Sequence, residues 1–246
     1  MDRALYVAMS GANQAMLAQA INGHNLANLS TPGFRADLTA MLSVDVEGPG
    51  LPSRVNSISG GAGTDLSHGP LMYTENELDF AVNGNGWIAI QSLDGGEAYT
   101  RAGNLRIDAL GQLTTGNGLP VLGEGGPIAL PPFEKVEIGK DGTVSVRGLG
   151  QPSNALQIVD RIKLVNPDET QLEKGDDGLL RLGNGDIAPA DASVSLITGA
   201  LEGSNVNAVD ALVNSIILAR QFEAHIKVME TVEQNDSATT RLMQFS

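Results

Sequence analysis

The sequence predicts an α+β protein, with one helix at each end of the chain and a β-rich region between the ends. All 11 Pro lie between Pro32 and Pro189, and Gly is rare before Phe34 and absent after Gly203. Gly and Pro break helices and favour turns. Both ends also carry apolar residues at helical spacing, which the middle lacks.

The N-terminal segment is predicted to form one amphipathic helix from about Asp2 to Asn28. Its apolar positions recur every three or four residues, the spacing of a helix–helix seam, with polar exceptions at Gln19 and Gly23. The run ends at residues 30–33, STPG, which is a clear stop. The candidate helix-interface residues are Leu5, Met9, Ala12, Met16 and Leu26.

The C-terminal segment is predicted to form a single long helix, with Ser204 or Asn205 as its N-cap. Neither Gly nor Pro occurs after Gly203. A helix of about 38 residues is about 57 Å long, so it needs a coiled-coil partner or an extended packing surface. The candidate interface residues are Val209, Leu212, Ile216, Ala219, Phe222, Ile226 and Met229.

The middle of the chain is predicted to form short strands after an extended connector. The predicted domains are residues 1–34, a Gly/Pro/Ser-rich connector 35–73, a central all-β domain 74–198, and residues 199–246. Residues 79–82 and 87–90 are predicted to form a hairpin around the turn 83–86, NGNG. Further strands are predicted at 97–101, 105–108, 112–114, 135–138, 143–146, 158–165 and 179–182.

Charge and composition exclude several classes of function. The formal net charge is −14, and there is no Cys. Such an acidic protein is repelled by nucleic acid and by anionic lipid. Disulfides, thiolate catalysis and Cys-ligated metals are excluded. No apolar run approaches the roughly 20 residues of a membrane-spanning helix, and no cleaved signal peptide is visible at the N-terminus. We therefore expect no nucleic-acid partner and no membrane insertion.

No pattern in the sequence predicts a catalytic, cofactor or metal site. The three His residues lack the i, i+4 spacing of a metal-binding helix. The Gly84–Gly86 segment resembles part of a phosphate loop, but no helix follows it. The acidic groups at 75–79 and 176–177 do not match a calcium loop. With a single Trp, aromatic platforms for sugars are scarce. The sequence therefore favours a non-enzyme with no small-molecule substrate.

Two motifs at opposite ends of the chain resemble a known family. Residues 22–35 read NGHNLANLSTPGFR and residues 199–209 read GALEGSNVNAV. They resemble the terminal signatures of the flagellar axial proteins, the rod, hook and hook-associated families, although His24 and Arg35 stand where Asn and Lys are commoner. Residues 74–91 and 99–123 resemble the rod and hook central domain. The matching motif residues are Asn25, Leu26, Ala27, Asn28, Thr31, Gly33, Phe34, Arg35, Gly199, Leu201, Glu202, Ser204, Asn205, Val206, Asn207 and Val209.

The resemblance implies a structural subunit of the flagellar basal-body rod that polymerises and transmits torque from motor to hook. In this family the terminal helices pair as a coiled-coil-like core, with the β domain outside. The implied partners are further copies, neighbouring rod proteins and the flagellar type III export apparatus, which exports the chain to the periplasmic rod without a cleaved signal peptide. The termini are expected to be disordered before assembly.

The resemblance leaves the branch of the family open. The opening, MDRALYVAMSGA, is most similar to the proximal-rod branch. A distal-rod or hook-family paralogue and a transient rod-assembly factor are alternatives. A peptidoglycan-active enzyme or a carbohydrate-binding module is a remote one.

Overall fold

The protein consists of two compact units, each assembled from separate stretches of the chain. The computed structural model describes residues 2–45, 55–152 and 155–244. Unit 1 comprises Met1–Leu29, Ala36–Asp65 and Val206–Ser246, and unit 2 comprises Ser30–Arg35 and Leu66–Asn205. Both helices belong to unit 1, and unit 2 is built from strands, so the predicted α+β order of helix, β region and helix is confirmed. In the part of the chain described, no helix combines the length and apolarity needed to cross a membrane.

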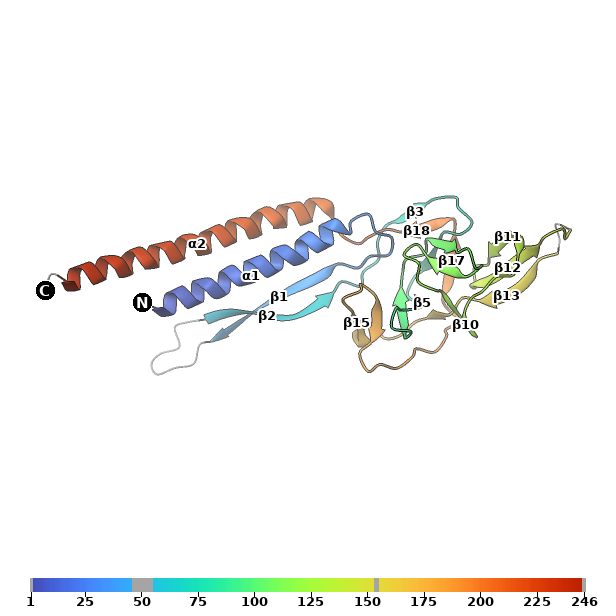
Figure 1. Ribbon diagram of the computed structural model, residues 1–246, viewed down its shortest axis with the longest axis horizontal. Helices are drawn as coiled ribbons and strands as arrows, with labels where there is room; N and C mark the ends of the chain where they lie inside the picture. Colours follow the sequence, from blue (N-terminus) through green and yellow to red (C-terminus); the bar gives the residue numbers. More distant parts are fainter. Residues whose placement is uncertain (1, 46–54, 153–154, 245–246) are drawn as a thin grey trace. The chain divides into compact units, whose positions relative to one another are not determined.

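The two helices of unit 1 lie side by side and run antiparallel (Figure 1). Helix α1 spans Asp2–Ala27 and α2 spans Ala208–Gln244. The Gln19 side-chain amide donates to the Ser215 hydroxyl at 2.8 Å, and the Asn22 amide donates to the Ala211 carbonyl at 2.7 Å. The polar residue Gln19, an exception in the predicted seam, therefore makes an interhelical hydrogen bond.

The cap of α2 differs from the prediction. The backbone N–H of Val209 donates to Asn207 Oδ1 at 3.0 Å, so Asn207 is the N-cap. Ser204 and Asn205, the predicted caps, lie upstream in unit 2. The Asn205 N–H donates instead to the carbonyl oxygen of Phe34 at 3.3 Å, so tertiary contacts hold this segment outside the helix.

Small residues form the buried stripe of α1. Apart from Gln14, its buried side chains are all alanines, and Ala211 is the buried residue of α2 among the side chains described. Small side chains let helix backbones approach closely. At Gly11 the approach is so close that a Cβ atom would lie 2.4 Å from Cε1 of His225. The alanines are Ala8, Ala12, Ala15 and Ala18.

Two glycines of α1 provide a matched test of this close approach. A Cβ atom at Gly23 would meet nothing within 4 Å, whereas one at Gly11 overlaps the His225 ring. Both substitutions gain about 1 kcal/mol of helix propensity. We expect Gly11→Ala to be less stable than Gly23→Ala by about 0.5–1.5 kcal/mol, because the His225 side chain must leave its preferred rotamer to make room for the methyl group. Urea unfolding followed by the helical circular dichroism measures the difference. Equal stabilities of the two variants would contradict the close contact. If His225→Ala is added to both variants, the difference between their stabilities should become smaller.

A long antiparallel hairpin accompanies the helices. Strand β1 spans Asp37–Asp45 and β2 spans Val55–Thr64, with Asp37 paired to Thr64, and Figure 1 shows α1 between α2 and this hairpin. No strand was predicted here, because the Gly- and Ser-rich sequence of β2 has little intrinsic strand preference. Its conformation depends on the partner strand. Residues 46–54 of the predicted connector lie outside the described residues.

Unit 2 contains a five-stranded sheet in the order β14-β5-β6-β16-β15, a three-stranded sheet β11-β12-β13 and four strand pairs, of which β18-β3 and β17-β4 join distant parts of the chain. The strands are β3 Leu71–Tyr73, β4 Phe80–Asn83, β5 Trp87–Gln91, β6 Glu97–Thr100, β7 Leu105–Ile107, β8 Leu113–Thr115, β9 Leu122–Gly123, β10 Gly126–Pro127, β11 Phe133–Ile138, β12 Thr143–Gly148, β13 Gln157–Arg161, β14 Leu164–Val165, β15 Leu172–Lys174, β16 Leu180–Leu182, β17 Ser195–Thr198 and β18 Ala200–Glu202.

The prediction of a hairpin at residues 79–90 is wrong. The turn exists, with Gly84 at φ 72° and Gly86 at φ 130°, but its flanking strands belong to different sheets. Strand β4 pairs with β17, and β5 pairs with β6 and β14. The local Asn-Gly sequence determined the turn, whereas partners far along the chain determined the pairing. The predicted strand 158–165 is likewise divided into β13 and β14.

Two hydrophobic clusters form the core of unit 2. The larger contains Phe80, Ile88, Leu113 and Val144, each exposing no more than 1% of its surface. The smaller surrounds Trp87 and Tyr99. Burial raises the pKa of Tyr99 to about 12, and its hydroxyl accepts the Ala188 N–H at 2.7 Å. The lone Trp is therefore a core residue, next to the site described below.

Candidate functional site

The Asn-rich motif at the end of α1 fixes the start of strand β1. The Asn25 amide donates to the Asp37 carbonyl at 2.8 Å and accepts the Asp37 N–H at 2.9 Å, as a neighbouring strand would. His24 Nδ1 lies 2.8 Å from Asp37 Oδ2. The Asn28 amide donates to the His24 carbonyl at 3.0 Å, which satisfies one carbonyl at the helix end. Two of the predicted Asn residues thus have structural roles in unit 1.

The segment that follows this motif, residues 30–35, is embedded in unit 2. Gly33 has φ 69°, and its N–H donates to the Glu202 carbonyl at 2.8 Å. The ammonium group of Lys174 lies 4.1 Å from the centroid of the Phe34 ring and donates to the Arg35 carbonyl at 2.7 Å. A cation over an aromatic face is attracted by the ring quadrupole. Residues 33–35 are therefore held in unit 2 by hydrogen bonds and by this cation–π contact.

Gly33 is required both for its backbone angle and for space. A Cβ atom there would lie 2.3 Å from the Arg101 carbonyl carbon. Gly185 has a similar φ of 74° but nothing within 4 Å of its Cβ position, so Gly185→Ala measures the cost of the angle alone. That cost is about 1–2 kcal/mol. We expect Gly33→Ala to cost at least about 1–3 kcal/mol more, because backbone must shift. Thermal unfolding of both variants tests this, and equal losses would show that space at Gly33 is not limiting.

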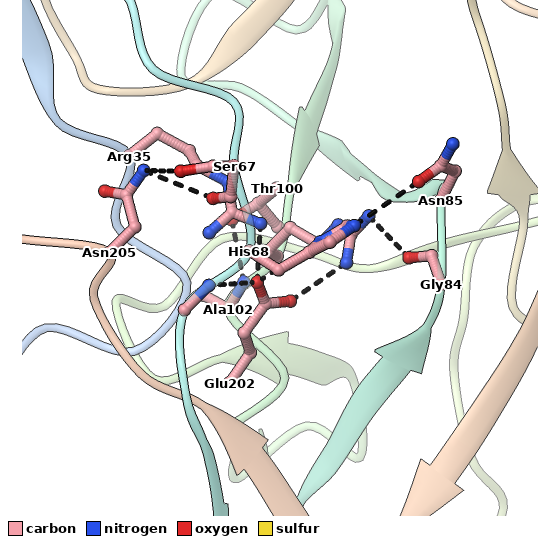
Figure 2. Close-up of polar contacts among 11 residues, drawn as sticks. Arg35, Ser67, His68, Gly84, Asn85, Thr100, Ala102, Glu202 and Asn205 are labelled. Atoms are coloured by element: carbon pink, nitrogen blue, oxygen red, sulfur yellow. Dashed lines mark hydrogen bonds and ion pairs between the residues drawn. The ribbon is translucent and has the colours of Figure 1, made fainter.

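Three charged side chains and the lone Trp form a buried cluster, which we call the clasp: Arg35, Arg101, Glu202 and Trp87. Arg35 Nη2 lies 2.6 Å from Glu202 Oε1, and Arg101 Nη1 lies 2.9 Å from Glu202 Oε2. All three charged side chains are only 2% exposed. Figure 2 shows Arg35 and Glu202 among these contacts. The arginines are 167 and 101 residues from Glu202 in sequence.

The indole ring of Trp87 completes the clasp. The guanidinium carbons of Arg101 and Arg35 lie 4.9 and 5.5 Å from the ring centroid. Arg35 Nε and Nη1 and Arg101 Nε have no hydrogen-bond acceptor among the described residues. The π surface next to them is therefore their remaining favourable contact. Arg101 Nη2 also donates to the Gly84 carbonyl at 2.8 Å, which ties the turn before β5 to the cluster (Figure 2).

Opposite effects act on the ionisation of the clasp. Burial by itself raises the pKa of Glu202, but the charges of Arg35 and Arg101 outweigh burial, so the pKa lies below its ordinary value of 4.5. Burial lowers the pKa of Arg101, and Glu202 partly offsets this. Arginine stays protonated in proteins. At neutral pH the clasp therefore contains two cations and one anion, all out of water.

The C-terminal motif supplies more than Glu202. Gly199 has φ 73°, and its carbonyl accepts the N–H groups of Thr74 and Glu75. Leu201 and Ser204 are buried, and β18 pairs with β3. The Asn205 amide donates to the Ser67 carbonyl at 3.2 Å (Figure 2). Asn207 caps α2, as described above. Of the remaining motif residues, Leu26 and Val206 are half-buried and Ala27, which ends α1, is exposed.

The predicted helix-interface residues divide into two groups. Ala12 is buried, and Leu5, Leu26, Phe222, Ile226 and Met229 are half-buried. Exposed residues make up the other group, which we call the apolar helix face; they are Met9, Met16, Val209, Leu212, Ile216 and Ala219. Val209 exposes 67% and Ile216 57% of its surface. The single chain thus leaves half of the predicted seam uncovered.

Unit 1 also contains a groove of about 370 Å³ next to the Asn-rich motif. It lies where the last turns of α1, the first residues of β1 and the first half of α2 meet. Its walls combine apolar side chains with amides. The lining residues are Ala18, Ile21, Asn22, Asn25, Ala36, Asp37, Leu38, Thr39, Asn214, Ile217 and Leu218.

The residues considered for chemistry have other partners in the structure. His24 contacts Asp37, His68 lies near Asn85 and Glu202, and His225 packs on Gly11. Asp79 accepts the Thr74 hydroxyl, Glu77 pairs with Lys135, and Asp177 pairs with Arg181. Trp87, the single Trp, is 3% exposed and offers no face to a sugar.

Sequence reasoning identified Glu202 as a motif residue but not the cluster around it. The sequence marks Arg35 only as a motif match and Trp87 only as the single Trp, and it does not single out Arg101. One feature of the sequence indicates Arg35, Trp87 and Arg101: all three lie in segments that resemble the family, although each lies in a different segment. Only the fold brings these segments together.

Models of three flagellar families match this chain along its length. They are described as "Flagella basal body rod protein" for residues 5–35, "Flagellar hook protein FlgE/F/G D1 domain" for residues 81–146 and "Flagellar basal body rod FlgEFG protein C-terminal" for residues 197–242. The clasp takes Arg35 from the first match, Trp87 and Arg101 from the second and Glu202 from the third.

Full-length relatives are similar over the whole chain. The flagellar basal-body rod protein FlgF of Escherichia coli is 43% identical and that of Salmonella typhimurium 42%, each over 100% of both chains. FlgF of Caulobacter vibrioides is 33% identical over 98% of both. FlgG of Buchnera aphidicola subsp. Schizaphis graminum is 32% identical over 94% of this chain and 95% of its own. The chain belongs to the FlgF family of flagellar basal-body rod proteins.

Proposed function

We propose that this protein is a structural subunit of the proximal part of the flagellar basal-body rod, and that it polymerises through its terminal helices to transmit torque from motor to hook. Full-length similarity to FlgF proteins supports the family and the location in the basal body. The observation that carries the mechanism is the apolar helix face. Ile216 and Val209 are more than half exposed on a single chain, as expected of side chains that another subunit covers.

The terminal helices form the assembly core in this proposal. Helices α1 and α2 form the coiled-coil-like axial core and unit 2 forms the outer β domain, whereas strands β1 and β2 of the predicted connector form a hairpin of unit 1. Covering one Ile or Leu side chain contributes roughly 1.5–3 kcal/mol, so several per subunit make association favourable. The contacts are heterologous, because a helical polymer repeats one head-to-tail contact instead of closing on itself. The groove beside Asn25 is a second surface for a neighbouring subunit.

The proposed partners are further copies of the chain, neighbouring rod proteins and the flagellar type III export apparatus, through which the chain leaves uncleaved. We propose no catalytic activity. A peptidoglycan-active site would need an exposed aromatic platform beside carboxylates. The groove of about 230 Å³ in unit 2 includes Glu124 and Asp191 but no aromatic side chain, and Trp87 is buried.

Quantitative mass spectrometry of purified hook–basal bodies tests the proposal. We expect the protein at a few copies per particle, close to the number of the other proximal-rod proteins. Enrichment in particles that end before the distal rod separates the proximal position from a distal or hook position. If intact particles lack the protein although the gene is expressed, the structural role fails and a transient assembly factor takes its place.

A further inference from the structure

All three segments by which the chain passes from one unit to the other meet at the clasp. Residues 30–35 belong to unit 2, although residues before and after them belong to unit 1. The chain passes again at residues 65–66 and 205–206. Each of the three segments, all within unit 2, forms hydrogen bonds with Glu202 or with its immediate neighbours in the sequence.

The Glu202 carboxylate bonds to the first two segments directly. Its Oε1 atom accepts a hydrogen bond from Arg35 Nη2 at 2.6 Å and from the Gly69 N–H at 3.0 Å. Its Oε2 atom accepts one from Arg101 Nη1 at 2.9 Å, and Arg101 belongs to the body of unit 2. One carboxylate thus connects residues 30–35, residues 66–69 and the β domain.

The third segment is continuous with Glu202 itself. The Glu202 carbonyl accepts the Gly33 N–H at 2.8 Å, and the Asn205 side-chain amide donates to the Ser67 carbonyl at 3.2 Å. The Asn205 N–H then donates to the Phe34 carbonyl at 3.3 Å. Residues 201–205 are therefore bonded to both other segments. Breaking one set of bonds exposes the buried partners of the others, which is the condition for cooperative opening.

We propose that the clasp is a coupling device, in which Glu202 makes the three passing segments, 30–35, 66–69 and 201–205, order and open together as one unit. The coupling is independent of rod assembly and goes beyond the proposed function. As a result, the segments that connect unit 2 to α1, to the β1–β2 hairpin and to α2 become ordered at the same time. Failure of the rod proposal would leave it unaffected.

Hydrogen exchange of the full chain, read by mass spectrometry, tests the coupling with Arg35→Lys. The variant keeps the charge but loses the planar fork that contacts Glu202. We expect about tenfold faster exchange, the size of a weakened charge-assisted hydrogen bond, in peptides covering residues 29–36, 66–71 and 199–206. The 66–71 peptide is decisive, because Gly69 bonds to Glu202 and not to Arg35. Peptides from the separate sheet β11-β12-β13, which contains no clasp residue, should keep their rates.

Arg181→Lys is the matched control. Arg181 Nη2 lies 2.6 Å from Asp177 in the same unit, but both side chains are about one-third exposed. We expect no change in the three segments for this variant. Faster exchange of residues 29–36 alone in Arg35→Lys would show that the segments open separately. Equal acceleration in the sheet β11-β12-β13 would show that the clasp only supports global stability. Either result overturns the proposal. Glu202→Gln should open all three segments, and Arg35→Lys decides alone if Glu202→Gln does not fold.

Discussion

Replacing Ile216 by Asp is expected to abolish incorporation into the rod while the single chain stays folded. Ile216 is 57% exposed in α2, so the isolated subunit gains little by burying it, and surface substitutions usually change stability by no more than about 0.5 kcal/mol. In the proposed polymer the same position lies in an apolar contact with a neighbouring subunit. A carboxylate there loses roughly 1.5–3 kcal/mol of burial and must also be desolvated without a partner. Every subunit repeats the loss.

Swimming in soft agar and the composition of isolated basal bodies measure this effect in cells whose only copy is the variant. Leu212→Asp, one turn away on the same face, should behave alike. Val228→Asp is the matched control: Val228 is 49% exposed in the same helix but outside the predicted seam. Circular dichroism and export levels show that each variant folds and leaves the cell. Normal rods with Ile216→Asp would refute assembly through this face, and failure of Val228→Asp alone would move the interface to another side of α2.

Neutralising Glu202 should destabilise unit 2 strongly, and far more than neutralising an exposed carboxylate of the same unit. Glu202→Gln leaves the guanidinium groups of Arg35 and Arg101 buried without their counter-ion, and breaking a buried ion pair costs about 3–5 kcal/mol. Asp177→Asn removes the same charge from an exposed pair and should cost at most about 1 kcal/mol. Because Trp87 is the only Trp and lies against both arginines, its fluorescence follows the unfolding of the clasp directly.

The same carboxylate predicts sensitivity to acid. The pKa of Glu202 is lower in the folded protein than its ordinary value of 4.5, so folding favours the ionised form. This contribution to stability is complete above pH 4.5 and is lost as the pH falls below 4.5 through the folded-state pKa. The urea midpoint of the native protein, read from Trp87 fluorescence, should fall over that range. In Glu202→Gln the urea midpoint should be lower than in the native protein at neutral pH, and it should change less as the pH falls. If the urea midpoints of the two proteins fell in parallel with pH, Glu202 would not be the group responsible.

The sequence predicted most reliably where the local pattern and the tertiary contacts agree. Both helices begin and end within a few residues of the predictions. Residues 30–33, STPG, follow α1 and Gly203 precedes α2, and within the helices the tertiary contacts agree with the local helical pattern. The strands predicted at 135–138 and 143–146 also form, as the antiparallel neighbours β11 and β12. Predictions failed where a distant partner decides. Strand β4 pairs with β17 instead of β5, and β2 forms from a sequence with little preference for strand.

In the candidate site, too, the sequence predicted some features and not others. The motifs containing Asn25, Gly33 and Glu202 were recognisable in the sequence, because their types and spacing match a family pattern. Their bonding partners were not. The exposed state of Ile216 also could not be read from periodicity, since a repeat of three and four residues shows that a helix has an apolar face but not what covers it.

The sequence by itself determined the order of elements, the turn at residues 83–86, the acidic net charge and the membership of a rod family, because these depend on residue type and short-range spacing. Only the tertiary structure decided which strands pair, which glycines have no room for a side chain, and that Arg35, Arg101 and Glu202 share one buried site. The physical reason is distance along the chain: these contacts join residues 101 to 167 positions apart, and their stability comes from removal from water, which no local pattern records.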